Sequence, residues 1–120
     1  MAVIELLGME FRARHGCLDW EKITDQSFVV DFSARYDTRA AERSDALEDT
    51  LDYSAVYAVI AAQMAVPSNL LEHLCGRIER AIATQFPFLE EFSISVSKLS
   101  PAVGGPAKCA RVSVEHKAGK

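Results

Sequence analysis

Residues 28–36 alternate between two faces with a strict period of two. Every second position is apolar and the positions between them are mostly polar; the apolar set is Phe28, Val30, Phe32, Ala34 and Tyr36. This repeat predicts a β-strand, because successive side chains of a strand point to opposite faces of the sheet. One face of the strand is expected to be buried, so other parts of the chain must cover it.

An earlier strand, over residues 3–14, shows the same period with one change of phase. Ile4 and Leu6 occupy even positions, whereas the apolar residues of 9–13 occupy odd positions. A slip of this kind at Gly8 is what a β-bulge produces. The two strands are expected to pair as a long hairpin, followed by a polar connection over 37–52.

Two helices are expected in the middle of the chain. The first covers 53–65, and a side chain from Asp49, Thr50 or Asp52 caps its start. The second begins at Asn69, because Glu72 three residues later has the spacing of a capping box. It ends at Phe86-Pro87.

Two further strands, around 92–96 and 110–114, are joined by a loop rich in Pro and Gly. The order β-β-α-α-β-β predicts an α+β fold with one four-stranded antiparallel sheet and both helices on one face. We expect a single domain over 1–120 with a flexible tail over 117–120. An open sheet has two unpaired edges, which favours a homo-oligomer.

The composition excludes several classes of protein. Thirteen Lys and Arg residues against seventeen Asp and Glu residues give a net charge of −4, with no basic cluster, so no nucleic-acid partner is expected. The longest apolar stretch, 55–66, is too short to cross a bilayer, and no basic region precedes the N-terminal apolar run as in a signal peptide. Three unpatterned cysteines indicate a reducing compartment, the cytoplasm, and the His and Cys spacings predict no metal site.

Four places put polar side chains beside the end of a strand or helix. They are the loop with Glu21, the helix start at 49–53, the helix start with Glu72, and Lys98 at the end of the third strand. Each has an ordinary interpretation as a solvated charge, a helix cap, a capping box or a surface lysine. Each could also serve a site, since a carboxylate can bind a cationic or amidine-like edge. Spacing alone does not decide between these interpretations.

Several motifs occur together over nearly the whole chain, from about Ile4 to Glu115. They are Gly8-Met9-x-Phe11-x-x-x-His15-Gly16 with Glu21, Gln26-x-Phe28-x-Val30-Asp31, Asp45, Asp49-Thr50-Leu51-Asp52-Tyr53-x-x-Val56, Asn69-Leu70-Leu71-Glu72-His73-Leu74, Lys98 and Val112-x-Val114. In this combination the chain resembles the dihydroneopterin aldolases of folate biosynthesis. The resemblance implies the tunnelling fold (T-fold), in which four subunits join their sheets into a barrel and two rings form an octamer. The sequence does not decide whether this chain forms the tetramer or the octamer. The resemblance also implies active sites between subunits.

The resemblance also implies a reaction. Family members cleave 7,8-dihydroneopterin, a pterin, to 6-hydroxymethyl-7,8-dihydropterin and glycolaldehyde by a retro-aldol step. Such a cleavage needs an electron sink, which other aldolases supply with a lysine Schiff base or a zinc ion. Here the N5=C6 imine of the substrate is the sink, so no cofactor is expected.

By position, Lys98, Tyr53 and Glu21 match the catalytic residues of the family. The residues that match its substrate-binding positions are Glu72 for the aminopyrimidine edge, Leu71 and Leu51 through their backbone, Thr50, and Tyr53 from a neighbouring subunit. Either Tyr53 or Lys98 removes the hydroxyl proton, and the sequence leaves this open. The segment Leu99–Gly105 departs from the family's usual Pro-Pro-Ile-x-Gly type of loop, which bears on contact with the substrate tail.

Three alternatives accompany this interpretation. The same scaffold can carry a dedicated 2′-epimerase of dihydroneopterin or its triphosphate, because re-addition after cleavage gives an epimer, and an aldolase is expected to show some of this activity. The chain could also be a non-catalytic pterin-binding ring protein. Zinc-dependent pterin synthases of the same fold need clustered histidines, which His15, His73 and His116 do not supply by spacing.

Overall fold

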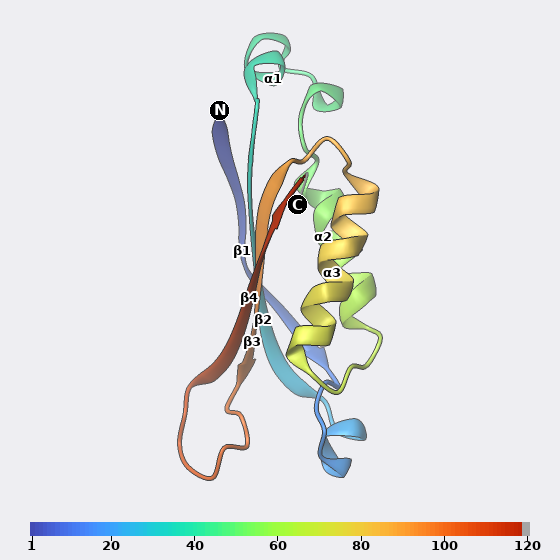
Figure 1. Cartoon of the computed structure of the whole chain (residues 1–120), viewed down its shortest axis with the longest axis vertical. Helices are drawn as coiled ribbons and strands as arrows, with labels where there is room; N and C mark the ends of the chain where they lie inside the picture. The colour runs from blue at the N-terminus through green and yellow to red at the C-terminus, as the bar shows by residue number, and fades with distance from the viewer. Residues whose placement is uncertain (119–120) are drawn as a thin grey trace.

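The computed structural model describes residues 1–118, and its framework is one four-stranded sheet (Figure 1). The strands are β1 (Ala2–Ala13), β2 (Gln26–Tyr36), β3 (Glu91–Leu99) and β4 (Cys109–Lys117). Each pairs antiparallel with the next, in the spatial order β1-β2-β3-β4. The predicted α+β fold with one antiparallel sheet is confirmed, and β1 and β4 are its two edges.

The predicted bulge in β1 is present at Gly8. The pairing with β2 shifts register between Leu6 and Met9, and Gly8 has a φ of 70°, a left-handed conformation that glycine adopts without steric cost. Its N–H donates to Asp31 Oδ1 at 2.6 Å. The extra residue lets the apolar side chains on both sides of the bulge face the same core.

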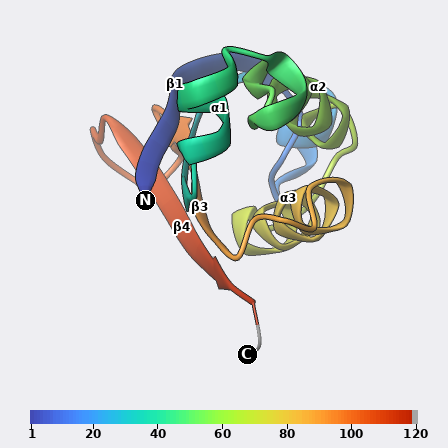
Figure 2. The ribbon, with the colours of Figure 1, turned by 90° about the horizontal axis from the view of Figure 1, so that it is seen from above.

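Helices α2 (Tyr53–Met64) and α3 (Leu71–Gln85) cover one face of the sheet (Figure 1). Viewed along the long axis, α2 lies on the side of β1 and α3 on the side of β3 and β4 (Figure 2). Asp52 caps α2 by accepting from Ser54 N and Ala55 N, as one of the three expected caps.

The expected start of α3 is wrong by two residues. Its N-cap is Leu70, in an extended conformation and without a side-chain hydrogen bond, so the capping box between Asn69 and Glu72 does not form. The backbone carbonyl of Asn69 instead accepts from Cys17 Sγ at 3.5 Å. The segment before α3 is therefore tied to the loop after β1 rather than wound into the helix.

The polar connection after β2 is less irregular than the sequence indicates. It contains the short helix α1 (Arg39–Ser44) and the 3-10 helix η2 (Leu47–Asp49). Neither buries an apolar residue, so no hydrophobic periodicity announces them. Polar side chains also contact one another at the start of α1, where the guanidinium of Arg39 donates hydrogen bonds to the carboxylate of Asp37.

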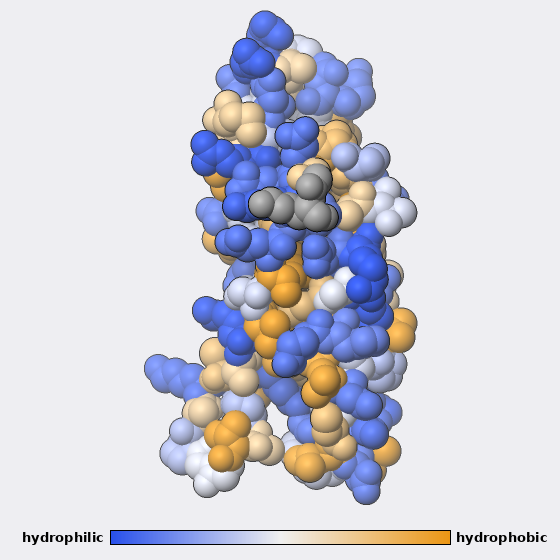
Figure 3. Space-filling view, in the orientation of Figure 1, coloured by the Kyte–Doolittle hydropathy of each residue, from blue (hydrophilic) through white to orange (hydrophobic). Residues whose placement is uncertain are grey.

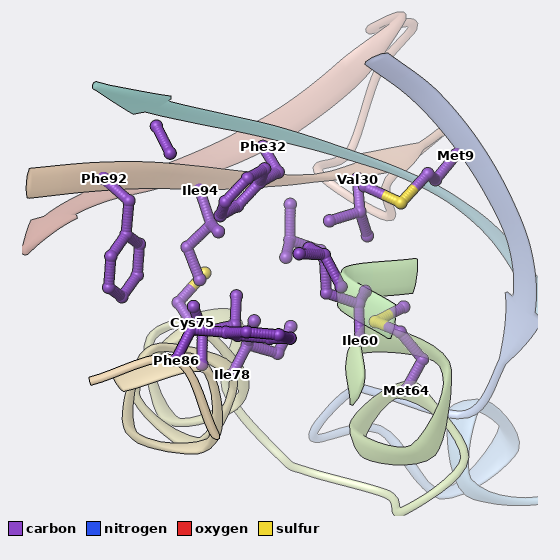
Figure 4. Packing of buried hydrophobic residues seen from close by; sticks show 14 of the residues in the cluster. Met9, Val30, Phe32, Ile60, Met64, Cys75, Ile78, Phe86, Phe92 and Ile94 are labelled. Carbon is purple, nitrogen blue, oxygen red and sulfur yellow. The ribbon is translucent and has the colours of Figure 1, made fainter. Parts of the chain in front are cut away.

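The core lies between the sheet and the two helices (Figure 4). Phe32, Val30 and Ile94 point from the sheet toward Ile60 of α2 and Ile78 of α3, and all five are buried. Burying each such side chain contributes about 1.5–3 kcal/mol. The core therefore holds both helices on the same face.

The chain remains paired in the sheet almost to the last described residue. Lys117 still pairs with Glu91 and Ala118 N donates to Glu90 O, although a flexible tail was expected over 117–120; residues 119–120 lie outside the described part. Within residues 1–118, no helix has both the length and the apolar character needed to cross a bilayer.

A buried histidine joins the end of β1 to the connection between α2 and α3. His15 is 1% exposed, its Nδ1 accepts from Ser68 N at 3.0 Å, and its Nε2 lies 3.0 Å from the carbonyl oxygen of Met64. These partners require a neutral ring with the proton on Nε2. Burial is the main cause that lowers the pKa of His15 below 6.5, and Arg77 and Lys98 act in the same direction.

This pairing makes a prediction about pH. The unfolded chain binds a proton on His15 at higher pH than the folded chain, so the stabilisation is complete above about pH 6.5 and is lost as the pH falls toward the folded pKa. Unfolding by urea between about pH 8 and pH 5 should show this decrease. His15→Asn should flatten the slope; an equal slope in both proteins would contradict the assignment.

Candidate active site

Lys98 and Glu21 form an ion pair that is largely shielded from water. Lys98 is the next-to-last residue of β3, and its Nζ donates to Glu21 Oε2 and to the carbonyl oxygen of His15 at 2.8 Å. The two side chains are only 12% and 7% exposed. The solvated-loop interpretation of Glu21 and the surface interpretation of Lys98 are therefore both wrong.

The loop after β1 is shaped to hold the carboxylate of Glu21. Glu21 lies in the 3-10 helix η1 (Asp19–Lys22), and its Oε1 accepts from Leu18 N at 3.2 Å. Gly16 lies against it so closely that an added Cβ would stand 2.4 Å from the carboxylate. Burial acts to raise the pKa of Glu21, but the hydrogen bonds from Lys98 and Leu18 outweigh it, and the net shift is downward.

Leu71 and Glu72 lie at the same end of the molecule. The connection before them is bound to the loop after β1, since Gly16 N donates to Ser68 O at 3.0 Å. Glu72 is the second residue of α3 and is exposed, and none of the described residues donates a hydrogen bond to its carboxylate. A free carboxylate on the first turn of a helix is available to a ligand.

Thr50, Leu51 and Tyr53 lie at the opposite end. The hydroxyl of Tyr36, the last residue of β2, bonds Thr50 Oγ1 at 2.9 Å and accepts from Leu51 N at 3.4 Å. Tyr53 opens α2 and is 56% exposed. This group is therefore attached to the end of β2 where the strand leaves the sheet.

The two groups cannot meet within one chain. Lys98 pairs with Phe28, whereas the second group is bound to Tyr36, eight positions farther along β2. At about 3.3 Å per residue, this separation is roughly 26 Å. Figure 1 shows α2 starting at one end of the sheet and β3 finishing near the other. One chain therefore carries two parts of the predicted site rather than a complete one.

The Lys98 end also exposes apolar side chains. In Figure 3, hydrophobic residues gather in the lower half of the view, whereas the end with α1 is mainly hydrophilic. Large apolar residues that are 38–74% exposed lie in the connections at the Lys98 end and at the last residue of β3: Leu18, Trp20, Ile23, Val66, Leu70, Leu99 and Val103. Apolar side chains exposed at one end of a chain favour contact with another protein surface there.

Three residues of this region had no assigned role in the sequence interpretation. They are His15, Gly16 and Ser68, and all three are buried. His15 and Gly16 belong to a recognised motif, but what they contact depends on backbone atoms about fifty positions away. A His-Gly pair directly after a strand was the available signal, and no comparable signal marks Ser68.

The arrangement brings together groups that can transfer protons. A buried ammonium and carboxylate in contact supply an acid and a base, and Glu72 supplies a second, accessible carboxylate. Within residues 1–118, no group of three His, Cys, Asp or Glu side chains is placed to hold a metal ion.

Comparisons with known proteins agree with these features. The family model for dihydroneopterin aldolase (FolB) matches residues 4–116. The dihydroneopterin aldolase of Staphylococcus epidermidis is 35% identical over 104 residues, 86% of each chain, and that of Streptococcus pyogenes is 30% identical over 118 residues, 97% of this chain and 98% of the other.

A solved structure shows the same fold. The Escherichia coli dihydroneopterin aldolase, crystallised in complex with neopterin, superposes with a TM-score of 0.89 at 21% identity, covering 97% of this chain and 99% of that chain. With the family model and two relatives at 30% identity or more, this chain belongs to the dihydroneopterin aldolase family.

Proposed function

We propose that this protein cleaves 7,8-dihydroneopterin in sites that two copies of the chain build together. The observation that carries this proposal is the buried Lys98–Glu21 pair at the same end of the chain as the free carboxylate of Glu72, in a chain of the aldolase family. The neopterin in the E. coli structure supports a pterin as ligand. The unpaired cysteines fit the cytoplasmic location that the sequence predicts.

In the proposed reaction, a base removes the proton from the 2′-hydroxyl of the substrate. The C1′–C2′ bond breaks, C2′ and C3′ leave as glycolaldehyde, and the bonding electrons move through C6 to N5, which takes a proton. Protonation at C1′ with loss of the N5 proton then gives 6-hydroxymethyl-7,8-dihydropterin. The step needs one acid and one base near the reacting atoms and a pocket that fixes the ring.

Each predicted residue has a part in this scheme. Lys98 is the acid near N5, and Glu21 holds its ammonium in place. Glu72 accepts two parallel N–H bonds from the aminopyrimidine edge, and the backbone of Leu71 extends this contact. The neighbouring copy supplies Tyr53 against the ring.

Thr50 and the backbone of Leu51 come with Tyr53 from the neighbouring copy. The separation of about 26 Å between the two groups supports this division, because one pterin ring is too small to contact both groups of the same chain. The edges β1 and β4 and the apolar surface at the Lys98 end support contact between copies. A ring of four copies, stacked as an octamer, follows from the family resemblance.

One prediction of the proposed function concerns Lys98. Lys98→Ala should lower kcat by about 10²- to 10⁴-fold, the contribution of a positioned acid or base, while neopterin still binds. Chelator-treated protein is incubated with 7,8-dihydroneopterin, and the products are separated by chromatography. Release of glycolaldehyde at the wild-type rate by the variant would contradict the assignment, and formation of an epimer alone by the wild type would replace cleavage with epimerisation.

A second prediction separates binding from chemistry. Glu72→Gln keeps the shape of the side chain but loses its charge and one acceptor, so the Kd for neopterin should rise roughly 10- to 100-fold. Neopterin fluorescence measures this Kd. Glu42→Gln, which makes the same change at an exposed carboxylate on α1, is the matched control and should leave Kd unchanged. Equal Kd values for wild type and Glu72→Gln would remove Glu72 from the site.

A third prediction tests the shared site. Co-expression of Tyr53→Ala with Lys98→Ala should restore activity, because about a quarter of the sites in a random mixture combine an intact Tyr53 with an intact Lys98. Co-expression of Glu21→Gln with Lys98→Ala should restore none, since both residues belong to one chain's part of the site. Activity no greater than the sum of the single variants in the first mixture would refute the division.

A further inference from the structure

We propose that His15 is a positioning residue for the Lys98–Glu21 pair, acting through its own backbone carbonyl. The inference rests on the proposed function, because it concerns the same ion pair. The ring of His15 is bound to the connection between α2 and α3, and the carbonyl of the same residue receives the Lys98 ammonium. One residue thus links the catalytic lysine to a fixed part of the helical layer.

The loop around His15 needs this anchor, because the sheet does not provide one. The last β1 residue paired with β2 is Ala13, so residue 15 lies beyond the ladder of the sheet. Two contacts hold the carbonyl of residue 15 instead: the ring of His15 and the hydrogen bond from Gly16 N to Ser68 O. The ring also packs edge-on against the ring of Phe28, with the two ring centroids 5.1 Å apart, and this contact restricts the rotation of the His15 ring.

The connection that receives the ring is itself held from α3. Arg77 donates to Gln63 O at 3.0 Å, to Val66 O at 2.6 Å and to Ser68 Oγ at 2.8 Å. Gln63 belongs to the last turn of α2, where its carbonyl also accepts from Val66 N at 3.1 Å, and Val66 lies just beyond the end of the helix. The segment that binds His15 is therefore fixed to both helices.

Lys98 depends on this support more than Glu72 does. A lysine side chain is long and flexible, so the directions of its two acceptors, the Glu21 carboxylate and the His15 carbonyl, determine where Nζ lies. Helix α3 is held separately by its buried stripe, which includes Leu74, Cys75 and Ile78. Loss of the His15 ring contacts should therefore affect turnover and leave pterin binding largely unchanged.

The experiment uses two variants of different severity. His15→Asn can still accept from Ser68 N through its side-chain amide, whereas His15→Leu fills the space without a hydrogen bond. We expect kcat to fall about 10-fold in His15→Asn and about 100-fold in His15→Leu, since small displacements of a reacting group have effects of this size. The Kd for neopterin should change less than about 3-fold in both variants.

His116→Asn is the matched control. Like His15, His116 has a hydrogen-bonded ring, since its Nδ1 lies 3.0 Å from Glu79 Oε2. It is half-buried and pairs with Phe92, six positions along β3 from Lys98. It should retain the wild-type kcat. If His15→Leu does not fold, His15→Asn alone is compared with the wild type, and circular dichroism confirms that this variant is folded.

The outcomes separate the two claims. A wild-type protein that does not cleave dihydroneopterin overturns the proposed function itself. An active wild type with an unchanged kcat in folded His15 variants overturns only the positioning role. A parallel loss of kcat and neopterin affinity also overturns it, because it indicates a general structural defect rather than displacement of Lys98.

Discussion

The backbone pairing of β2 with its two neighbours is the constraint from which the rest of the structure follows. Its hydrogen bonds fix Phe28 opposite Lys98 and Ala34 opposite Phe92, so the ends of the sheet cannot approach one another. The side chains on one face of β2 are buried and anchor both helices, while its last residue, Tyr36, carries the segment with Thr50. A rigid strand of this length therefore holds the predicted site residues in two distant groups, one near Lys98 and one near Tyr36.

A buried ion pair is costly to form, and the loop after β1 shows how the cost is offset. Removing an ammonium and a carboxylate from water costs several kcal/mol per ion unless other groups replace the lost hydration. Here the His15 carbonyl and the Leu18 N–H do so, while Gly16 leaves space for the carboxylate. The surrounding backbone thus compensates for the lost hydration of the pair in a place shielded from water, where electrostatic interactions are strong.

The sequence predicted the parts of the fold that depend on periodic burial. The alternation over 28–36, the phase slip at Gly8 and the cap at Asp52 are local patterns, and the structure confirms them. The start of α3 lies at Leu71 rather than Asn69, and the backbone carbonyl of Asn69 contacts Cys17, a distant residue that no local pattern reveals. The anchor of His15 was missed for the same reason, since its partners are backbone atoms of Met64 and Ser68. Family resemblance named the site residues and implied sites between subunits, and the structure gives the distance between the group at Lys98 and the group at Tyr36, roughly 26 Å along β2.

The bulge at Gly8 is a place where β1 could lose one residue without disturbing the core. Between Leu6 and Met9, β1 has one residue more than β2 has between Phe32 and Val30. A deletion there would restore a regular strand and leave the same side chains facing the helices. What would change is the bend of the edge strand, because bulges increase local twist. The curvature of each sheet determines how many sheets are needed to close a ring. One inserted residue that leaves the core side chains in place can therefore change the number of subunits in any closed assembly.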